Sequence, residues 1–429
     1  MSMNASFSSF FHPRHQAFGL VGVLILLHFF SAQSALAETT NKRMILPGTR
    51  AQAMAGAYTA ISDDASAGWY NPAGLGFIQG PSASLTANNY THSIKTVSGG
   101  TTDSILAENS SAMYPGFAGS VTTLGPVVVG WSYFTLEKQN TDESQILDIV
   151  AEPSLEPFRY YRSNLTTGNL IHIGASLGMS LGTHLSIGIS EFYYRREQLA
   201  ALKERSLFSN SVFYDSFVRQ STKNEGTVTV SGAMLRMDSV TLGLSFRIPR
   251  ALTDKTDLET NTVVYTSASP ELGTTTLTTH REDELIVRTW NLGLAWQPTS
   301  WLTLSTDAIY YPATESPWRG AGGFNTKNVF DESAGFELRS TSLLLGAGIF
   351  TNSSLVKNPT PSASSVEPAR VDYLGYTASL GFASKQSETR IILVRQNGKG
   401  KAQVVQGSLT MHNITDTTES VCLSSRFQF

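Results

Sequence analysis

The chain has 429 residues, of which only 15% are charged, with 31 Lys and Arg against 34 Asp and Glu. Charged residues make up about a quarter of an average soluble domain. Their scarcity here, with a mean hydropathy of −0.08, predicts a surface that is not wholly in water. Beyond residue 37 no apolar run approaches the roughly 20 residues of a membrane helix. A net charge of −3 provides no basic patch for nucleic acid. The single cysteine excludes a disulfide framework and a Cys-based zinc site.

Residues 1–37 have the pattern of an export signal. Arg14 precedes an apolar run at 17–30, and the small residues Ala35 and Ala37 follow at cleavage-site spacing. The run is too short to span a bilayer, so we expect a signal peptide that is cleaved after Ala37. A membrane anchor is the alternative interpretation.

Residues 38–81 have a different composition from the rest of the chain. They are rich in Gly and Ala, and Asp63-Asp64 and Asn71-Pro72 are turn signals. Such a segment does not form a membrane strand. We expect it to precede the first strand, which the pattern of the chain places near residue 82.

From residue 82 onward, apolar residues alternate with small polar ones, which is typical of strands with two different faces. One clear case is 240–248. There one face carries Val240, Leu242, Leu244, Phe246 and Ile248, and the other carries Thr241, Gly243, Ser245 and Arg247. The segments 170–181 and 372–383 repeat this pattern. Small polar residues opposite apolar ones suit a barrel with lipid outside and a polar or plugged lumen, although a soluble β-sandwich would alternate too.

Fourteen strands are predicted, and most have the roughly 9 to 11 residues of a tilted membrane strand. They are expected at 82–90, 115–123, 126–136, 169–181, 184–195, 226–237, 240–248, 285–297, 301–311, 341–350, 371–384, 388–396, 402–411 and 421–429. Long connections alternate with tight turns, as in outer-membrane barrels. The alternation breaks at 351–370, which is long, and at 385–387, which is short. We therefore predict an all-β, transmembrane antiparallel barrel of 82–429, with 12 to 16 strands as the range.

The last residues, VCLSSRFQF, form an amphipathic strand that ends on Phe429. This ending resembles the terminal strand of bacterial outer-membrane proteins, in which the final phenylalanine belongs to the signal for the barrel-assembly machinery. The resemblance implies the assembly machinery and outer-membrane lipid as partners.

The 38–81 segment resembles the start of the FadL/TodX family of outer-membrane transporters for long-chain fatty acids and other hydrophobic compounds. The matching motifs are Gly48-Thr49-Arg50-Ala51, Gly56-Ala57, Asp63-Asp64-Ala65-Ser66 and Tyr70-Asn71-Pro72-Ala73-Gly74-Leu75. The resemblance implies that this segment is a hatch, or plug, inside a fourteen-stranded barrel. It also implies passive transport of fatty acids or hydrocarbons across the bacterial outer membrane.

The candidate hatch or gating residues are Arg50, Asp63, Asp64, Asn71, Pro72, Ala73 and Gly74. Short Asx side chains can bond nearby N–H groups where no regular ladder does so, and proline gives a rigid turn. A structural role in holding the hatch is therefore favoured over ligand contact. We expect Arg50 to pair with an inward-facing carboxylate such as Asp307 or Asp372.

Aromatic residues in the long connections are candidates for ligand capture, chiefly Phe213, Tyr214 and Phe217. Exposed aromatic clusters often mark interaction sites, although an aromatic girdle at the membrane interface is the alternative. Gly130, midway along 126–136, is a candidate wall kink beside a lateral opening. We favour the other interpretation, a small inward residue that leaves room for the hatch.

Two other functions remain open. The long polar connections allow a barrel that binds or anchors protein partners, as in secretion-associated scaffolds. A general diffusion porin would need a charged, unplugged lumen. No catalysis, cofactor or metal is expected. His172 lies centrally on an inward face but no G-x-S-x-G motif accompanies it, and no spaced His/Asp/Glu set is present.

Overall fold

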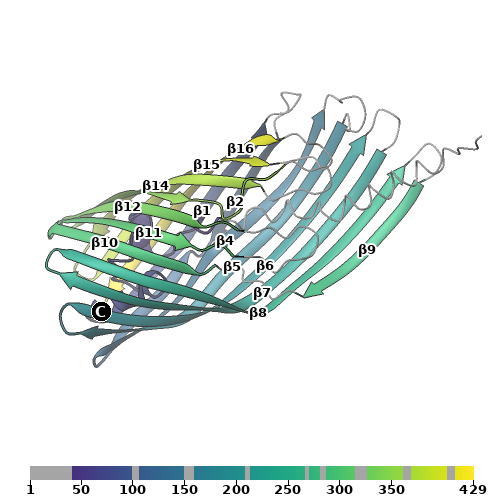
Figure 1. The fold of residues 1–429 in the computed structure, drawn as a ribbon. Coiled ribbons are helices and arrows are strands. Elements are labelled where there is room, and N and C mark those ends of the chain that lie inside the picture. Colours follow the sequence, from purple (N-terminus) through teal and green to yellow (C-terminus); the bar gives the residue numbers. More distant parts are fainter. Residues whose placement is uncertain are drawn as a thin grey trace, which may run out of the picture.

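The structure, a computed structural model, describes residues 41–98, 106–148, 159–207, 213–265, 270–280, 287–314, 326–360, 369–402 and 411–429. They form one closed antiparallel β-barrel in which the first strand pairs with the last (Figure 1). The predicted signal peptide, 1–37, lies outside the described residues. No helix among the described residues is long and apolar enough to cross a bilayer.

The sixteen strand segments make fourteen barrel strands because two pairs of segments lie end to end. β2 and β3 both pair with β1, and β9 and β10 both pair with β8. The segments are β1 (Ser82–Ser98), β2 (Leu106–Tyr114), β3 (Phe117–Leu124), β4 (Val127–Asp148), β5 (Arg159–Leu181), β6 (Leu185–Leu207), β7 (Phe213–Met237), β8 (Val240–Tyr265), β9 (Pro270–His280), β10 (Thr289–Thr299), β11 (Leu302–Tyr311), β12 (Val329–Arg339), β13 (Leu343–Asn352), β14 (Arg370–Ala383), β15 (Ser387–Ala402) and β16 (His412–Gln428). The predicted fold and strand number are confirmed.

The two faces of the wall are those of a membrane barrel. On the outer face Ile189 and Leu244 are 50% and 49% exposed, whereas their neighbours Ser190 and Ser245 face inward and are buried. Many other Leu, Ile, Phe and Trp side chains are exposed in the same way. A soluble sandwich would turn apolar residues into its core. An apolar outer belt around a polar interior is instead the arrangement that a lipid bilayer requires.

One barrel strand was missed, and one of the fourteen predicted strands adds none between its neighbours, so the count is unchanged. The segment 329–339 was assigned to a long connection but forms β12. The segment 402–411 was predicted as a strand; most of it lies outside the described residues, and β15 and β16 pair directly up to Ala402 and His412. Once β12 is counted, the connection between β13 and β14 lies at the same end of the barrel as the other long connections. The breaks in alternation at 351–370 and 385–387 therefore disappear.

Five strands are much longer than a membrane requires. β4 to β8 have 22 to 26 residues, against about 9 to 11 for a tilted span. Much of 137–168, 196–225 and 249–284, predicted as connections, is therefore strand. These strands and β9 project well past the rest of the barrel at one end (Figure 1). We call this the loop end, and the opposite end, where the tight turns lie, the turn end.

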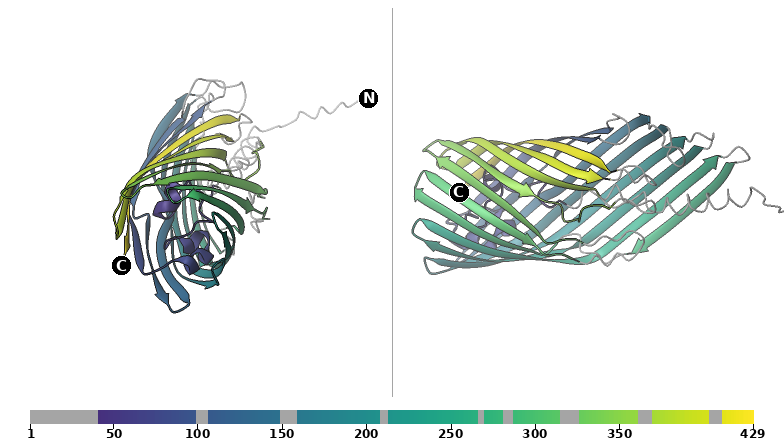
Figure 2. Two further views of the ribbon diagram at one scale, coloured as in Figure 1. Left: turned by 90° about the vertical axis from the view of Figure 1, so that its left-hand side faces the viewer. Right: turned by 45° about the horizontal axis from the view of Figure 1, so that its top comes forward.

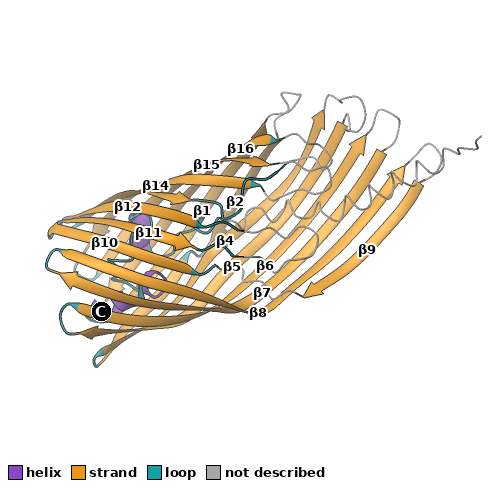
Figure 3. Ribbon diagram, viewed as in Figure 1, coloured by secondary structure: helices purple, strands orange, loops and turns teal. Residues whose placement is uncertain are grey.

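The hatch, described from residue 41 to residue 81, lies inside the barrel (Figure 2). It contains the only helices among the described residues, which are α2 (Thr49–Ala53), α3 (Ala67–Tyr70) and η2 (Pro72–Phe77). The other regular secondary structure of these residues is strand (Figure 3). Wall glycines let the hatch approach closely. A Cβ atom at Gly178 of β5 would lie 2.6 Å from Cβ of Leu75 and 2.8 Å from the carbonyl oxygen of Pro72.

Candidate functional site

The turn at Asn71 joins three parts of the molecule. Its side-chain amide donates to the carbonyl of Thr59 in the hatch at 2.9 Å and to that of Ala233 in β7 at 3.2 Å. Its side-chain oxygen accepts from the N–H of Ala73 at 3.2 Å and so caps η2, where Pro72 occupies the first position. The contacts with Thr59 and Ala73 satisfy backbone groups of the hatch, which lies outside the ladders of the wall. They are structural contacts, and of these residues only Thr59 also lines the cavity described below.

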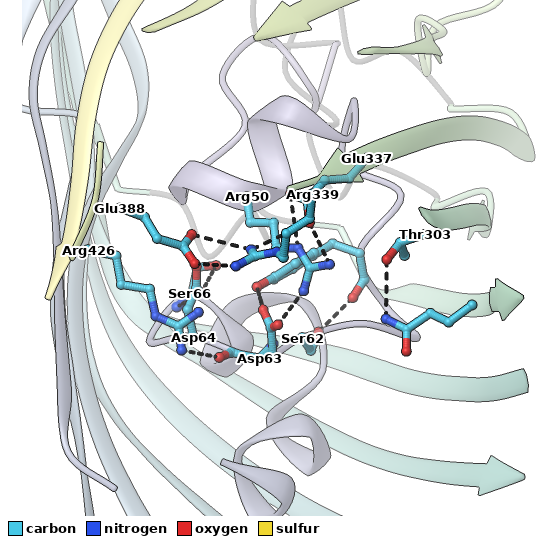
Figure 4. Close-up of polar contacts among 12 residues, drawn as sticks. Arg50, Ser62, Asp63, Asp64, Ser66, Thr303, Glu337, Arg339, Glu388 and Arg426 are labelled. Atoms are coloured by element: carbon cyan, nitrogen blue, oxygen red, sulfur yellow. Dashed lines mark hydrogen bonds and ion pairs between the residues drawn. The ribbon is translucent and has the colours of Figure 1, made fainter. Parts of the chain in front are cut away.

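A cluster of charged side chains joins the hatch to the wall near the turn end (Figure 4). This charge cluster consists of Arg50, Asp63 and Asp64 of the hatch, Glu337 and Arg339 of β12, Glu388 and Arg390 of β15, and Arg426 of β16. Arg50 pairs with Asp63 and, at 2.9 Å, with Glu337. Four arginines face four carboxyl groups, so the cluster is neutral as a whole.

The wall side of the cluster is itself tightly paired. Arg390 lies 2.7 Å from Glu337, and both side chains are only 1% exposed. Arg339 pairs with Glu388 at 2.5 Å, and Arg426 donates to the carbonyl of Asp63 at 2.9 Å. Because an unpaired charge in such a place is costly, Arg50 and its wall partners depend on one another.

The predicted partner of Arg50 was wrong. The wall carboxylate is Glu337, which lies on β12, the strand that the sequence analysis had placed in a connection. Asp307 instead accepts hydrogen bonds from the N–H groups of Tyr58 and Thr59, at 2.9 and 2.8 Å. Asp372 pairs with Arg370 at 2.6 Å. Asp307 therefore does hold the hatch, but it binds backbone N–H groups of the hatch and not the side chain of Arg50.

Charge and burial act in opposite directions on the two hatch carboxyls. Burial would raise the pKa of Asp63, but the attraction of Arg50 and Arg426 outweighs it and holds this pKa far below its usual range. Tyr58 also donates to Asp63, at 2.7 Å. At Asp64 burial prevails and raises the pKa, although Arg426 opposes it. Asp63 is therefore the hatch carboxylate whose charge the cluster stabilises.

A cavity of about 100 Å³ lies between the hatch and the wall. The chain segment 41–47 forms one side of it, and Trp69 and Tyr70 of the hatch form another. The wall contributes residues of β4, β5, β8, β10 and β11. Its apolar lining includes Leu46, Leu136, Leu170, Val287 and Ile309, and its charged lining is Lys42, Arg43, Glu137, Arg247 and Asp307.

The segment 41–47 is fixed to the wall by hydrogen bonds. The side chain of Asn41 donates to the carbonyls of Asn352 and Val371 at 2.9 and 3.0 Å, and Gln396 donates to the carbonyl of Met44 at 2.9 Å. Burial lowers the pKa of the Lys42 amine to about 8; neighbouring Arg196 lowers it further and Glu137 opposes this.

Gly130 lies in an undisturbed part of β4. It pairs in register with Val121 of β3 and Ser176 of β5, and a Cβ atom there would lie 3.7 Å from the hatch residue Leu75. The strand has no register shift at this position. This geometry is that of a small inward residue facing the hatch.

One irregular part of the wall lies nearer the loop end. Pro115 and Gly116 separate β2 from β3, and at this level β4 bulges at Leu136. From here toward the loop end, β2 and β4 pair at a single described position, Ser110 with Thr141. Leu136 also lines the cavity. The interrupted pairing of the wall therefore adjoins the cavity.

The three aromatic residues proposed for capture lie on a strand instead of in a connection. Phe213 begins β7, and Tyr214 and Phe217 follow within it near the loop end. Phe217 is half-buried. It does not line the cavity, and the side chains of Phe213 and Tyr214 lie outside the described part of the structure.

His172 lies among aromatic rings where the hatch meets the wall. Its ring is stacked on Phe134 at 5.0 Å and meets Trp69 edge-on at 5.1 Å. Both of its ring nitrogens are buried and have no hydrogen-bond partner among the described residues. The packing around the ring is therefore aromatic.

Sequence reasoning missed Glu337 because its strand was missed, and it did not single out Arg247. A signal for Arg247 was present. It is the one charged residue on the inward parity of 240–248, among Thr241, Gly243 and Ser245.

We predict that Arg50→Ala loosens the hatch. Loss of one member of a buried, paired set costs about 3 kcal/mol, which corresponds to amide exchange faster by on the order of 100-fold. Hydrogen exchange of residues 49–77, followed by mass spectrometry, measures this. Arg195→Ala is the control, because Arg195 forms an exposed pair with Glu197 and such pairs contribute little. Unchanged exchange in Arg50→Ala would contradict the role of the cluster.

The pKa of Asp63 predicts how the hatch responds to acid. A carboxyl whose pKa is lowered in the seated hatch stabilises it above the ordinary pKa of about 3.9, and this stabilisation is lost as the pH falls further. Single-channel recordings should therefore show a closed barrel from about pH 5 to pH 8 and openings below about pH 4. In Asp63→Asn, openings should already occur at neutral pH. Openings of the unaltered protein that increase between pH 5 and pH 8 would argue against this assignment.

Comparison with known proteins supports the fold. No protein-family model and no curated protein matches the chain. A FadL homologue of Pseudomonas aeruginosa is similar in structure with a TM-score of 0.63 and 15% identity, over 89% of this chain and 98% of its own.

Two toluene transporters are similar as well. TodX of P. putida gives a TM-score of 0.60 and 12% identity, over 88% of this chain and 97% of its own. TbuX of Ralstonia pickettii gives a TM-score of 0.54 and 14% identity, over 90% of this chain and 99% of its own. The chain thus has the fold of the FadL homologue and of the toluene transporters TodX and TbuX, which is the fold that the resemblance of its first residues implied.

Proposed function

We propose that this protein lets hydrophobic compounds, fatty acids or hydrocarbons, cross the bacterial outer membrane passively. The observation that carries the proposal is the cavity with a largely apolar lining between the hatch and the wall, beside an interrupted part of that wall. An apolar solute gains by staying out of water. A mainly apolar pocket with a few placed polar groups is the usual form of a small-molecule site.

The structural relatives support the same function. TodX and TbuX are toluene transporters, and this chain shares their barrel. A shared fold does not by itself imply a shared activity. The cavity in this chain is therefore the stronger ground for the proposal.

The proposed path has three steps. Ligand is captured on the loop-end part of β7, where Phe213, Tyr214 and Phe217 lie. It then enters the cavity beside Trp69. It leaves when the hatch shifts, or through the wall near Leu136. In this path Arg50, Asp63, Asp64 and the Asn71-Pro72-Ala73-Gly74 turn keep the hatch seated and do not contact the ligand.

The outer membrane is the proposed location. The apolar belt would contact its lipid, after export directed by the predicted signal peptide, 1–37. Phe429 follows β16 and is 81% exposed, which supports its proposed recognition by the barrel-assembly machinery. A general diffusion porin fits less well, because residues 41–81 occupy the lumen.

Filling the cavity should weaken ligand binding. Thr289 of β10 lines the cavity, is 1% exposed, and its hydroxyl has no hydrogen-bond partner. Thr289→Phe should therefore place a ring in the cavity without breaking a hydrogen bond. We expect saturable binding of a labelled long-chain fatty acid or of toluene to weaken by about tenfold or more, because overpacking costs about 1–3 kcal/mol.

The control is Leu292→Phe on the same strand, since Leu292 faces lipid and is 58% exposed. Equal binding by both variants would exclude this cavity as the ligand site. No saturable binding of any apolar ligand by the unaltered protein would contradict the transporter function. A barrel that binds protein partners would then be the remaining interpretation.

A further inference from the structure

Three basic residues, Arg370 of β14 and Lys399 and Lys401 of β15, form a patch on the outer face of the wall near the loop end, which we call the basic patch. The two lysines are exposed. They share a face of β15 with Ile391 and Leu393, which belong to the apolar belt and are 53% and 52% exposed. β14 and β15 pair without a register shift, so this face points outward along both strands.

The charges of the basic patch are not balanced by the protein. Arg370 and Lys401 lie directly opposite each other in the ladder, and like charges in such a pair destabilise a sheet. The residue opposite Lys399 is Asp372. Its carboxylate already accepts from Arg370 at 2.6 Å and from the N–H of Ser354 at 2.9 Å. Neither lysine has an ion-pair partner among the described residues, so three cations share one carboxylate.

A second pair of opposed lysines in the wall is neutralised. Lys223 of β7 lies opposite Lys255 of β8. Lys223 pairs with Glu225 at 2.8 Å, and Lys255 pairs with Asp257 at 3.0 Å. Here each lysine has a carboxylate of its own. The basic patch therefore differs from the rest of the outer face in keeping a net positive charge toward its surroundings.

The position of the basic patch determines which anion can reach it. The outer face of β15 is apolar up to Leu393 and continues with Arg395, which pairs with Glu419 at 3.1 Å. On β14 the exposed residues below the patch are Leu374 and Tyr376. β14 and β15 do not project with β4 to β8 (Figure 1). The patch thus lies at the upper edge of the apolar belt, where the head groups of the surrounding lipid meet water.

We infer that the basic patch binds the phosphate group of an anionic lipid in the external leaflet, with the acyl chains of this lipid along the apolar belt. Directly paired residues lie about 5 Å apart and alternate residues of a strand about 7 Å, so all three cations can reach one phosphate group. The phosphate relieves the repulsion between Arg370 and Lys401. It meets a planar set of donors on the arginine and a point charge on each lysine.

The apolar belt below the patch favours a lipid over a free phosphate ion. A free ion gains only the attraction of the three charges, whereas a lipid also keeps its chains on Leu374 and Leu393 and out of water. Basic residues near a membrane surface attract anionic lipids in this way. The inference requires the belt to lie in a membrane, and it is independent of what the barrel transports.

The test compares two lipids that differ only in the phosphate group. The full-length protein, purified in a neutral detergent, is titrated with dioleoyl phosphatidic acid or with dioleoylglycerol, and native mass spectrometry gives the affinity for each. We expect phosphatidic acid to bind about tenfold or more tightly, because each cation near a membrane surface contributes about fivefold. A large excess of inorganic phosphate should not displace it. Equal affinity for the two lipids, or displacement by inorganic phosphate, would overturn the inference.

A double variant assigns the preference to the basic patch. Lys399→Gln with Lys401→Gln should weaken binding of phosphatidic acid by about tenfold or more and leave binding of dioleoylglycerol unchanged. The matched control is Lys223→Gln with Lys255→Gln, which removes the same charge from lysines that have carboxylate partners. It should bind like the unaltered protein. Equal weakening in the two double variants would mean a general effect of net charge and would overturn the inference.

A further variant separates the basic patch from the cavity. Thr289→Phe, which fills the cavity, should leave binding of phosphatidic acid unchanged, because the patch lies on the outer face of the wall. Loss of this binding in Thr289→Phe but not in the Lys399 and Lys401 double variant would place the lipid in the cavity and contradict the inference. A change of electrophoretic mobility on heating shows for each variant that the barrel is folded, and the comparison of the two lipids in the unaltered protein needs no variant.

Discussion

The ion pairs of Arg50 with Asp63 and Glu337 are the interaction on which the position of the hatch in the lumen depends. A fourteen-stranded barrel without a plug would enclose water. Here the lumen is filled by a short segment with little regular structure, which must bury its own polar groups. The wall supplies partners for both its charges and its backbone. Glu337 binds Arg50, Asp307 accepts from two hatch N–H groups, and Ser245 donates to the carbonyl of Tyr70 at 2.6 Å.

The same lumen contains two kinds of buried arginine. Those of the charge cluster are paired, and their energetics favour a fixed hatch. Arg247 is held by an aromatic face and a carbonyl and has no described carboxylate partner. The paired charges lie near the turn end, and Arg247 lies beside the apolar cavity. The charges that seat the hatch and the arginine beside the cavity are thus different side chains, and Trp69 belongs to both the packed core and the cavity.

Much of the fold could be predicted from the sequence, because the alternation of apolar and small polar residues follows directly from lipid outside and a filled lumen inside. β12 could not, because its sequence VFDESAGFELR carries three acidic residues. Glu337 is tolerated on an inward face only because Arg50 and Arg390 neutralise it, and those partners come from distant parts of the chain. The loop-end halves of β4 to β8 were assigned to connections for a related reason, since strands in water do not need an apolar face toward lipid. The turn at Asn71 could be predicted from the neighbouring residues in the sequence. The contact of Arg247 with Trp69 could not, because it depends on where the hatch lies in the barrel.

Permeability to a hydrophilic solute tests most directly whether the hatch closes the barrel while a hydrophobic ligand still crosses. The full-length protein would be reconstituted in liposomes, and swelling in a small sugar would be measured alongside transfer of a labelled long-chain fatty acid to a trap protein inside. We expect transfer of the fatty acid that saturates, with no swelling above that of empty liposomes. Swelling at a rate that rises with the amount of protein, without saturable transfer, would mean an open diffusion channel and would contradict this account.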